Sequence, residues 1–243
     1  MRPRESSARQ RAYDFIQNKI LSGAWAGGTV VSELALSREM GSSRTPIREA
    51  VRQLAGEGLL SQTSHGPMAV TNLTRVDIAE IYELREAIEV YAVSKAARFS
   101  LGTPVLDRLH GFLGECESLR VALEVERQPR LNEVQMSRFI QADLGFHTLL
   151  VHAAANQRML KLIAETRLLI RIFSIRRDGH SAPQLLAIHQ QHRAILLAVE
   201  SGRGDEAKAI LADHIRASCQ ERMEAYDHWE RERALNSWSV DPA

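Results

Sequence analysis

Four residues of types that bind metal ions lie on helix faces that are otherwise apolar. Asp143 and His147 are four residues apart, so they share one face of a predicted helix with apolar residues such as Phe146. His192 and His214 lie on two further apolar stripes in the same half of the chain. Burying four polar side chains without partners would be costly, whereas one divalent cation would satisfy them all. Neutral imidazoles with one carboxylate favour zinc, with nickel or manganese as alternatives.

The same pattern has a simpler interpretation, in which each histidine is a hydrogen-bonded residue of an apolar core. His189 lies about one turn before His192 and is the main rival ligand. The residues alone therefore predict a candidate metal site and leave both interpretations open.

A second group of residues could bind DNA. Arg44, Arg48 and Arg52 recur at one-turn spacing on one face of a short helix whose other face is apolar. Pro46 is tolerated in a first helical turn and Thr45 could cap it, so we expect this helix to begin near Thr45. A guanidinium presents a rigid fork of donors that can bridge guanine O6 and N7 or clamp a phosphate. The spacing thus favours a helix that lies in the major groove.

The segments around this helix predict a winged helix-turn-helix. Residues 8–22 carry apolar side chains at helical spacing and are closed by Gly23, and a shorter helix ends at Gly41, just before the arginine helix. The spacing of apolar residues then changes from a helical to a strand-like period. Residues 59–62 and 68–71 are typical of two short strands joined as a β-hairpin. Three helices followed by a hairpin wing are a known DNA-binding arrangement.

The remainder of the chain predicts helices alone. Thr74 and Asp77 resemble a capping box that opens a long helix. Five breaks follow, near residues 102–104, 128–129, 156, 179–183 and 202–204, so we expect about six helices in a bundle. We therefore predict a mainly α protein, with a winged helix-turn-helix at residues 1–72, an all-α bundle at residues 73–231 and a frayed tail at residues 232–243.

Composition supports this division. The 243 residues suffice for two domains, and residues 1–75 hold ten basic and six acidic side chains although the whole chain has a net charge of only +1. This asymmetry favours a polyanionic partner for the first domain. No stretch is apolar enough to span a bilayer, and the first fifteen residues lack a signal peptide's apolar run, so we expect no membrane partner and a cytoplasmic protein. Cys116 and Cys219 form no CxxC pair and predict neither a disulfide framework nor a zinc knuckle.

The run from Ser43 to Val51, followed by the wing, resembles the winged helix-turn-helix of the GntR family of bacterial transcription regulators. The resemblance implies a homodimer that binds a short palindromic operator in double-stranded DNA. By position it assigns DNA contacts to Ser43, Arg44, Thr45 and Arg48 on the helix and to His65 and Gly66 on the wing. For Arg52 two roles remain possible, a solvated side chain or a contact to DNA. If it contacts DNA, a phosphate is favoured over a base. Without this context, a solvated face with a pair such as Arg48 with Glu49 would be the better interpretation.

The helical remainder resembles the FCD ligand-binding domain of the FadR-like branch of that family, through residues 84–89, 143–147, 156, 192–195 and 214. The resemblance implies that Asp143, His147, His192 and His214 are the metal ligands. The histidines that match no ligand position are expected at the surface or in an outer shell: His152, His180 and His228.

Four protein ligands leave room on a five- or six-coordinate ion for water or for a carboxylate oxygen of a small organic acid, so the metal would be part of the effector pocket. Arg85 lies on the apolar side of the first bundle helix, where it could pair with Glu89 or bind the acid's carboxylate. Asn156 could contact the effector or cap the helix that follows it.

We therefore expect a transcription regulator, a repressor, whose helical domain binds an organic acid beside a metal and changes the spacing of two DNA-binding heads through a hinge at residues 72–74. The main alternative is a metal-dependent enzyme acting on a small carboxylic acid, because an open metal position can activate water. The chain has no HExxH and no glycine-rich phosphate loop, so we expect no enzyme. A DNA architectural protein that ignores small molecules is the third possibility.

Overall fold

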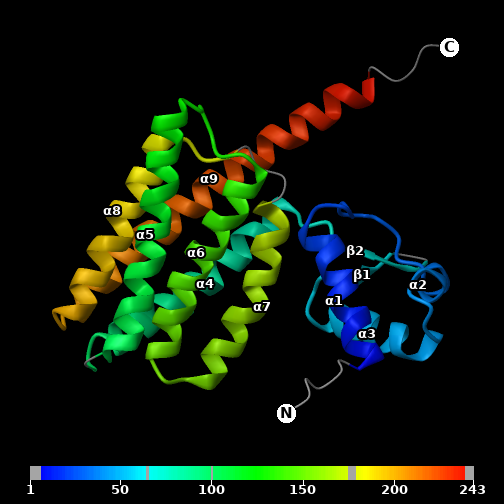
Figure 1. Cartoon of the computed structure of the whole chain (residues 1–243), viewed down its shortest axis with the longest axis horizontal. Helices are drawn as coiled ribbons and strands as arrows, with labels where there is room; N and C mark the ends of the chain where they lie inside the picture. The colour runs from blue at the N-terminus through cyan, green and yellow to red at the C-terminus, as the bar shows by residue number, and fades with distance from the viewer. Residues whose placement is uncertain (1–6, 64–65, 100, 175–178, 239–243) are drawn as a thin grey trace. The chain divides into compact units, whose positions relative to one another are not determined.

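A computed structural model describes residues 7–63, 66–99, 101–174 and 179–238 of the chain. Within these ranges it contains nine α-helices and one two-stranded antiparallel sheet, which confirms the predicted mainly α fold (Figure 1). The chain divides into two compact units. The first comprises Met1–Thr74 with Leu168–Arg176, and the second comprises Arg75–Arg167 with Arg177–Ala243.

The first unit begins with three helices, α1 (Ala8–Leu21), α2 (Glu33–Glu39) and α3 (Arg44–Gly56). The hydroxyls of Ser7 and Ser32 cap α1 and α2, because each accepts a hydrogen bond from a backbone N–H of the first turn. The apolar faces of the helices and of the hairpin enclose one core, formed by Ala12, Ile16, Ile20, Val31, Leu36, Ile47, Ala50, Val51, Leu54, Leu59, Leu60 and Val70. This core orients α3 so that its opposite face is exposed.

Helix α3 begins near Thr45, as expected, but with a different capping residue. Its N-cap is Ser43 and its first residue is Arg44, so Thr45 lies inside the helix and does not cap it. Pro46 is the third residue of the helix. Proline is tolerated there for the same reason as at the first position, because the N–H groups of the first turn have no intrahelical acceptor.

The hairpin consists of β1 (Leu60–Gln62) and β2 (Met68–Val70), which pair antiparallel as predicted. An isolated bridge between Val30 and Ala69 adds the segment before α2 to the hairpin, which was not expected because a single bridge has no sequence period. His65, one of the predicted DNA contacts, lies outside the described residues.

Six helices follow the hairpin in the described residues. They are α4 (Arg75–Ala96), α5 (Thr103–Glu126), α6 (Glu133–Ala153), α7 (Gln157–Ser174), α8 (Ala182–Glu200) and α9 (Gly204–Trp238). Every break falls where it was predicted, and the capping residues explain why. Capping boxes at Asn132 and Ser181 open α6 and α8, and Gly202 takes a positive φ of 68° between α8 and α9.

The bundle is held by two apolar clusters. Helix α4 packs against α6 and α9, α5 packs against α6 and α8, and α8 packs against α9 (Figure 1). One cluster joins α5, α6 and α8 through Cys116, Leu119, Leu123, Leu131, Met136, Phe139 and Leu185. The other joins α4, α6 and α7 through Ile88, Ala92, Val151, Ala154 and Ile163. Together they bring the inner faces of α4, α6 and α8 toward one another, and α9 joins them by packing against α4 and α8.

Helix α9 extends to Trp238, past residue 231, where we expected helical structure to fray. Glu, Arg, Ala and Leu in that segment are good helix formers, so the loss of an apolar period does not end the helix. A hydrogen bond from the Tyr226 hydroxyl to Glu230 Oε1 (2.9 Å) spans the turn of α9 just before residue 231. None of the described helices, α9 included, is both long and apolar enough to cross a membrane.

Candidate metal centre and DNA-binding helix

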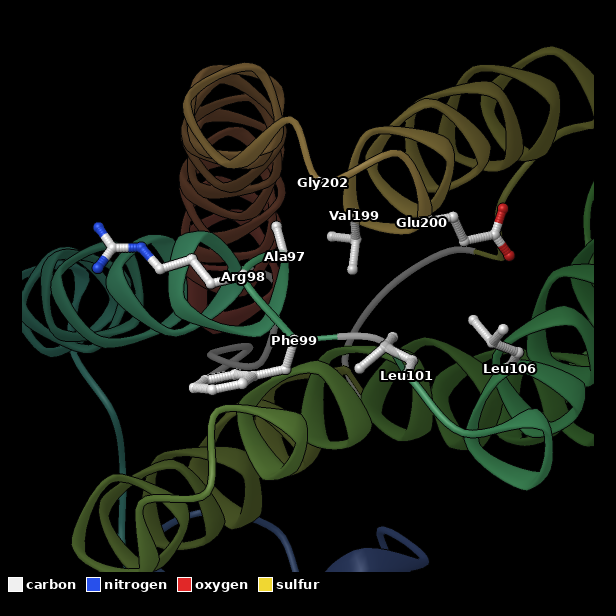
Figure 2. Close-up of a pocket in the computed structure, with 8 residues that line it drawn as sticks. All are labelled: Ala97, Arg98, Phe99, Leu101, Leu106, Val199, Glu200 and Gly202. Atoms are coloured by element: carbon white, nitrogen blue, oxygen red, sulfur yellow. The ribbon is translucent and has the colours of Figure 1, made fainter.

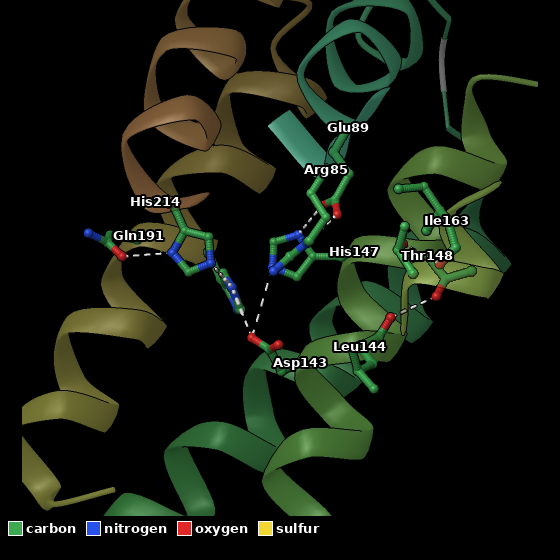
Figure 3. Close-up of polar contacts among 11 residues, drawn as sticks. Arg85, Glu89, Asp143, Leu144, His147, Thr148, Ile163, Gln191 and His214 are labelled. Carbon is green, nitrogen blue, oxygen red and sulfur yellow. Dashed lines mark hydrogen bonds and ion pairs between the residues drawn. The ribbon is translucent and has the colours of Figure 1, made fainter. Parts of the chain in front are cut away.

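The four predicted metal ligands converge from three helices. Asp143 and His147 lie on α6, His192 on α8 and His214 on α9, and one ligand atom of each lies within 4.8 Å of the corresponding atoms of the others (Figure 3). The Nε2 atoms of His192 and His214 are 3.2 Å apart, and Asp143 Oδ1 is 3.6 Å from His192 Nε2. The same oxygen is 3.9 Å from His147 Nε2.

The three histidine residues are buried, each at most 3% exposed, and Asp143 is partly buried. Burial lowers the pKa of His192 and of His214 well below the ordinary value, and the neighbouring imidazoles lower it further. Both rings are therefore neutral near pH 7. A neutral imidazole has a lone pair available, which is the state that binds a metal.

Two outer contacts orient the imidazoles. His214 Nδ1 lies 2.8 Å from the side-chain oxygen of Gln191, and His147 Nδ1 lies 2.7 Å from Glu89 Oε2 on α4 (Figure 3). The sequence pattern predicted neither role. Gln191 is the residue before His192, and Glu89 was considered only as a partner of Arg85, so helical spacing carried no sign that either faces a histidine.

The donor set fits a divalent cation. Among the described residues, His147 Nε2 is a buried nitrogen with no hydrogen-bond partner, although it faces the other three ligands. Buried polar atoms are rarely left without a partner, and those that are call for an explanation such as an ion. Bonds of about 2.0–2.2 Å to nitrogen and oxygen place ligand atoms about 3–4 Å apart, close to the spacing seen here.

Arg85 is buried and its Nε donates to Glu89 Oε1 over 2.7 Å. Arg85 was expected either to pair with Glu89 or to bind the carboxylate of the acid, and the structure contains the pair with Glu89. Burial alone would raise the pKa of Glu89, but the charges of Arg85 and His147 outweigh it and hold this pKa well below its ordinary value. The centre therefore includes a second carboxylate that stays ionised.

The remaining candidates lie elsewhere. Asn156 Oδ1 accepts from the backbone N–H groups of Arg158 and Met159, so its side chain caps α7. His189, the rival ligand, places Nδ1 3.2 Å from the carbonyl oxygen of Leu113 and does not belong to the cluster.

The three histidines without a ligand position are not all at the surface. His152 and His228 are exposed, whereas His180 is 2% exposed and packs edge-on against Phe139. His180 follows a break between helices, and the sequence pattern did not indicate that this loop turns inward.

All five predicted DNA contacts on α3 are exposed: Ser43, Arg44, Thr45, Arg48 and Arg52. Arg48 forms an ion pair with a residue of another helix and not with Glu49 of its own helix. Glu33 on α2 lies 3.2 Å from Arg48 Nε and 3.7 Å from Arg44 Nη2, and the two arginine side chains remain about half exposed. Gly66, on the hairpin, is partly exposed. An exposed pair of this kind contributes little to stability, so the guanidinium groups can exchange it for DNA.

Outside the histidine cluster, the described part of the chain includes two open hollows. A groove of about 880 Å³ runs between α3 and the hairpin, and its lining includes Arg48, Arg52 and Gln62. A smaller hollow of about 230 Å³ lies where the ends of α4 and α8 meet the start of α5 (Figure 2). Phe99 and Leu106 line this hollow, and no candidate metal ligand does.

Family models match both parts of the chain. Residues 8–70 match the model described as "Bacterial regulatory proteins, gntR family", and residues 80–217 match the FCD domain. The chain belongs to the GntR family of bacterial transcription regulators. Its second domain is an FCD domain, a type often found to bind metal, and the four-residue cluster lies within the matched range.

Relatives of this GntR regulator are named as transcriptional regulators or repressors. It is 29% identical over 211 residues to YdhC, an uncharacterized HTH-type transcriptional regulator of Bacillus subtilis (strain 168), covering 86% of this chain and 88% of YdhC. It is 25% identical over 207 residues to the HTH-type transcriptional repressor RspR of Escherichia coli (strain K12), covering 85% of each chain. The protein is thus a DNA-binding transcriptional regulator whose relatives include repressors, and the alternative of an enzyme finds no support among them.

Solved structures show the same fold. A GntR protein from Rhodococcus sp. RHA1 superposes with a TM-score of 0.71 at 22% identity, covering 91% of this chain and 100% of that one. E. coli McbR/YncC superposes with a TM-score of 0.70 at 18% identity, covering 91% and 99%.

Proposed function

We propose that this GntR regulator is a homodimeric repressor whose operator binding is controlled by a small organic acid bound beside a divalent metal, zinc in the first instance. The observation that carries the proposal is the buried cluster of Asp143, His147, His192 and His214, whose ligand atoms converge within 4.8 Å. These four residues would hold the ion. When bound, the metal supplies a positive centre with open positions for an anionic ligand.

Charge balance supports an anionic effector. Asp143 and Glu89 each contribute one negative charge to the centre and Arg85 contributes one positive charge. A divalent cation would leave one positive charge in excess in a largely buried site. Buried net charge is costly, so a ligand with a single carboxylate is the best complement. Nickel and manganese would give the same balance as zinc.

At the other end of the chain, Arg44 and Arg48 contact bases and Arg52 contacts a phosphate, while Ser43, Thr45, His65 and Gly66 complete the interface with each half of a palindromic operator. The exposed arginines on α3 support these roles. The linker of residues 72–74 is the hinge, and the protein acts in the cytoplasm, where operator DNA is accessible. Because coupling is reciprocal, an acid that weakens operator binding is itself bound more weakly by the DNA complex.

A thermal-shift experiment on the full chain tests the metal and the acid together. Sugar acids, hydroxy acids and dicarboxylates are screened with Zn²⁺ and, in parallel, with a chelator. We expect Zn²⁺ to raise the melting temperature and an acid to raise it further only when metal is present. His147→Ala should lose both shifts. His152→Ala, an exposed histidine on the same helix, should keep them.

Equal melting with and without metal in the wild-type protein would contradict the metal proposal. An acid response that persists in the chelator would contradict the placement of the effector beside the metal.

A further inference from the structure

Glu89 on α4 uses its two carboxylate oxygens for two different partners. Oε1 accepts from Arg85 Nε over 2.7 Å, and Oε2 lies 2.7 Å from His147 Nδ1 (Figure 3). All three residues are at most 4% exposed. The arrangement is therefore a buried chain that runs from a guanidinium through a carboxylate to an imidazole of the cluster.

A buried ion pair is weak evidence for a purely stabilising role, because the desolvation of both charges offsets most of their attraction. A pair of Arg85 with Glu89 would also need only one of the two carboxylate oxygens. The second oxygen is directed at His147, where it lies at hydrogen-bonding distance. This leaves the orientation of the imidazole as the feature that Glu89 determines.

An ionised carboxylate can only accept hydrogen bonds. With Nε2 as the ligand atom directed at the other three residues, the proton of His147 lies on Nδ1, where Glu89 Oε2 can accept it. Nε2 is one of the buried atoms without a hydrogen-bond partner among the described residues, and it faces Asp143. The contact between Glu89 and His147 thus accounts for two observations, the position of Glu89 and the unpaired Nε2 of His147.

His214 follows the same pattern with a different acceptor. Its Nδ1 lies 2.8 Å from Gln191 Oε1, and its Nε2 faces the cluster at 3.2 Å from His192 Nε2. Outer acceptors of this kind fix the tautomer of metal-binding histidines and raise their affinity for the ion.

We propose that Glu89 is a positioning residue of the metal centre, which holds His147 with Nε2 toward the ion, and that Arg85 acts through Glu89 rather than on the effector. This inference rests on the proposed metal site. Arg85 holds Glu89 in place, since its guanidinium pairs with that carboxylate in the bundle interior. An effector therefore meets the metal without a direct contact to Arg85.

The test compares Glu89→Gln with Glu83→Gln, which removes the same charge from an exposed position of the same helix. Zn²⁺ affinity of the full chain is measured by competition with a chromophoric chelator. We expect Glu89→Gln to lower the affinity by about 10- to 100-fold and Glu83→Gln to leave it unchanged. Co²⁺ absorption spectra report whether the ligand geometry changes with it.

Glu89→Gln leaves Arg85 without its carboxylate, so a stability loss could accompany the affinity loss. The double variant Arg85→Met with Glu89→Gln removes both charges and is expected to fold and still bind Zn²⁺ weakly. Nitrogen-15 NMR of the metal-free wild type gives an independent readout, in which His147 should carry its proton on Nδ1.

Two outcomes overturn the inference alone, namely wild-type Zn²⁺ affinity in a folded Glu89 variant, or a proton on His147 Nε2 in the wild type. A wild-type protein that does not bind Zn²⁺ overturns the proposed metal site as well.

Discussion

The arginine face of α3 and the histidine cluster of the bundle differ in how far apart along the chain their residues lie. The face of α3 is built from residues 43–52, all on one helix or at its cap. The cluster draws its ligands from α6, α8 and α9, and its outer contacts from α4 and α8. A site on one helix follows from spacing alone, whereas a site between helices depends on how the bundle packs.

Their ion pairs differ in the same way. Glu33 holds Arg48 at the surface, where solvent screens the pair and its exchange for a phosphate or a base costs little. Glu89 holds Arg85 in the interior, where breaking the pair would leave a charge without compensation. The first pair is suited to release on DNA binding, and the second is suited to holding a fixed geometry.

The largest effect should come from removing a ligand of the buried site. His192→Ala is expected to abolish stabilisation by Zn²⁺, which for a metal at a thousand times its Kd amounts to about 4 kcal/mol. His189→Ala, on the same helix but outside the cluster, should keep the full metal-induced shift. Melting of both variants with and without Zn²⁺ measures the difference. If the His189 variant loses the shift instead, the ligand set is wrong.

Acid should destabilise the metal-free bundle. His192 and His214 have pKa values well below the ordinary value in the folded state, so unfolding takes up protons once the pH falls below the unfolded pKa of about 6.5. Their contribution to stability is complete above that pH and is lost as the pH falls. Two protons give a slope of up to about 2.7 kcal/mol per pH unit. Urea denaturation in the presence of a chelator, at pH values between 5 and 7 (roughly the window set by the imidazole pKa), measures the slope. A flat profile would contradict the burial of neutral imidazoles.

At the surface site, Arg48→Ala should cost specificity. Loss of a bidentate guanine contact removes about 1–3 kcal/mol of discrimination between bases. Binding is measured against a duplex that the wild type enriches from a random-sequence pool and against an unrelated duplex. The gap in affinity between the two should narrow while the helical content stays the same. Unchanged discrimination would exclude Arg48 from base recognition.

The variant Asn156→Ala distinguishes between two roles of Asn156, capping α7 and contacting the effector. Loss of the hydrogen bonds to the first turn of α7 should lower the free energy of unfolding by about 1 kcal/mol. Zn²⁺ affinity and the thermal response to acids should stay at wild-type levels. A selective loss of the acid response would restore Asn156 as an effector contact.

The smallest effect is expected for Arg52→Ala. A phosphate contact carries no sequence information, so affinity should fall uniformly for all duplexes, and the slope of log affinity against log salt should fall by about 1. The matched comparison with Arg48→Ala distinguishes the two roles on one helix. Loss of discrimination in the Arg52 variant would instead assign a base contact to it.

Much of the fold could be predicted because its boundaries depend on local chemistry. Gly202 with its positive φ and the capping box at Asn132 stop or start helices through contacts within a few residues. The predicted end of α9 was wrong, because it was based on apolar periodicity alone. The helix-forming residues beyond residue 231 continue the helix without that periodicity. Thr45 was assigned as a cap because Pro46 is usual at the first position, although the first turn accepts it at the third.

By itself, the sequence determined the order of the helices, the exposed arginine face of α3 and the four polar residues on apolar stripes, because each follows from spacing along one helix. Only the tertiary structure decided which oxygen meets which nitrogen. Glu33 reaches Arg48 from another helix, Glu89 reaches His147 across the bundle, and Gln191 reaches His214 from α8. Helical periodicity specifies which face of a helix turns inward, but the partner across the interface depends on the packing of two helices, which no single stretch of sequence contains.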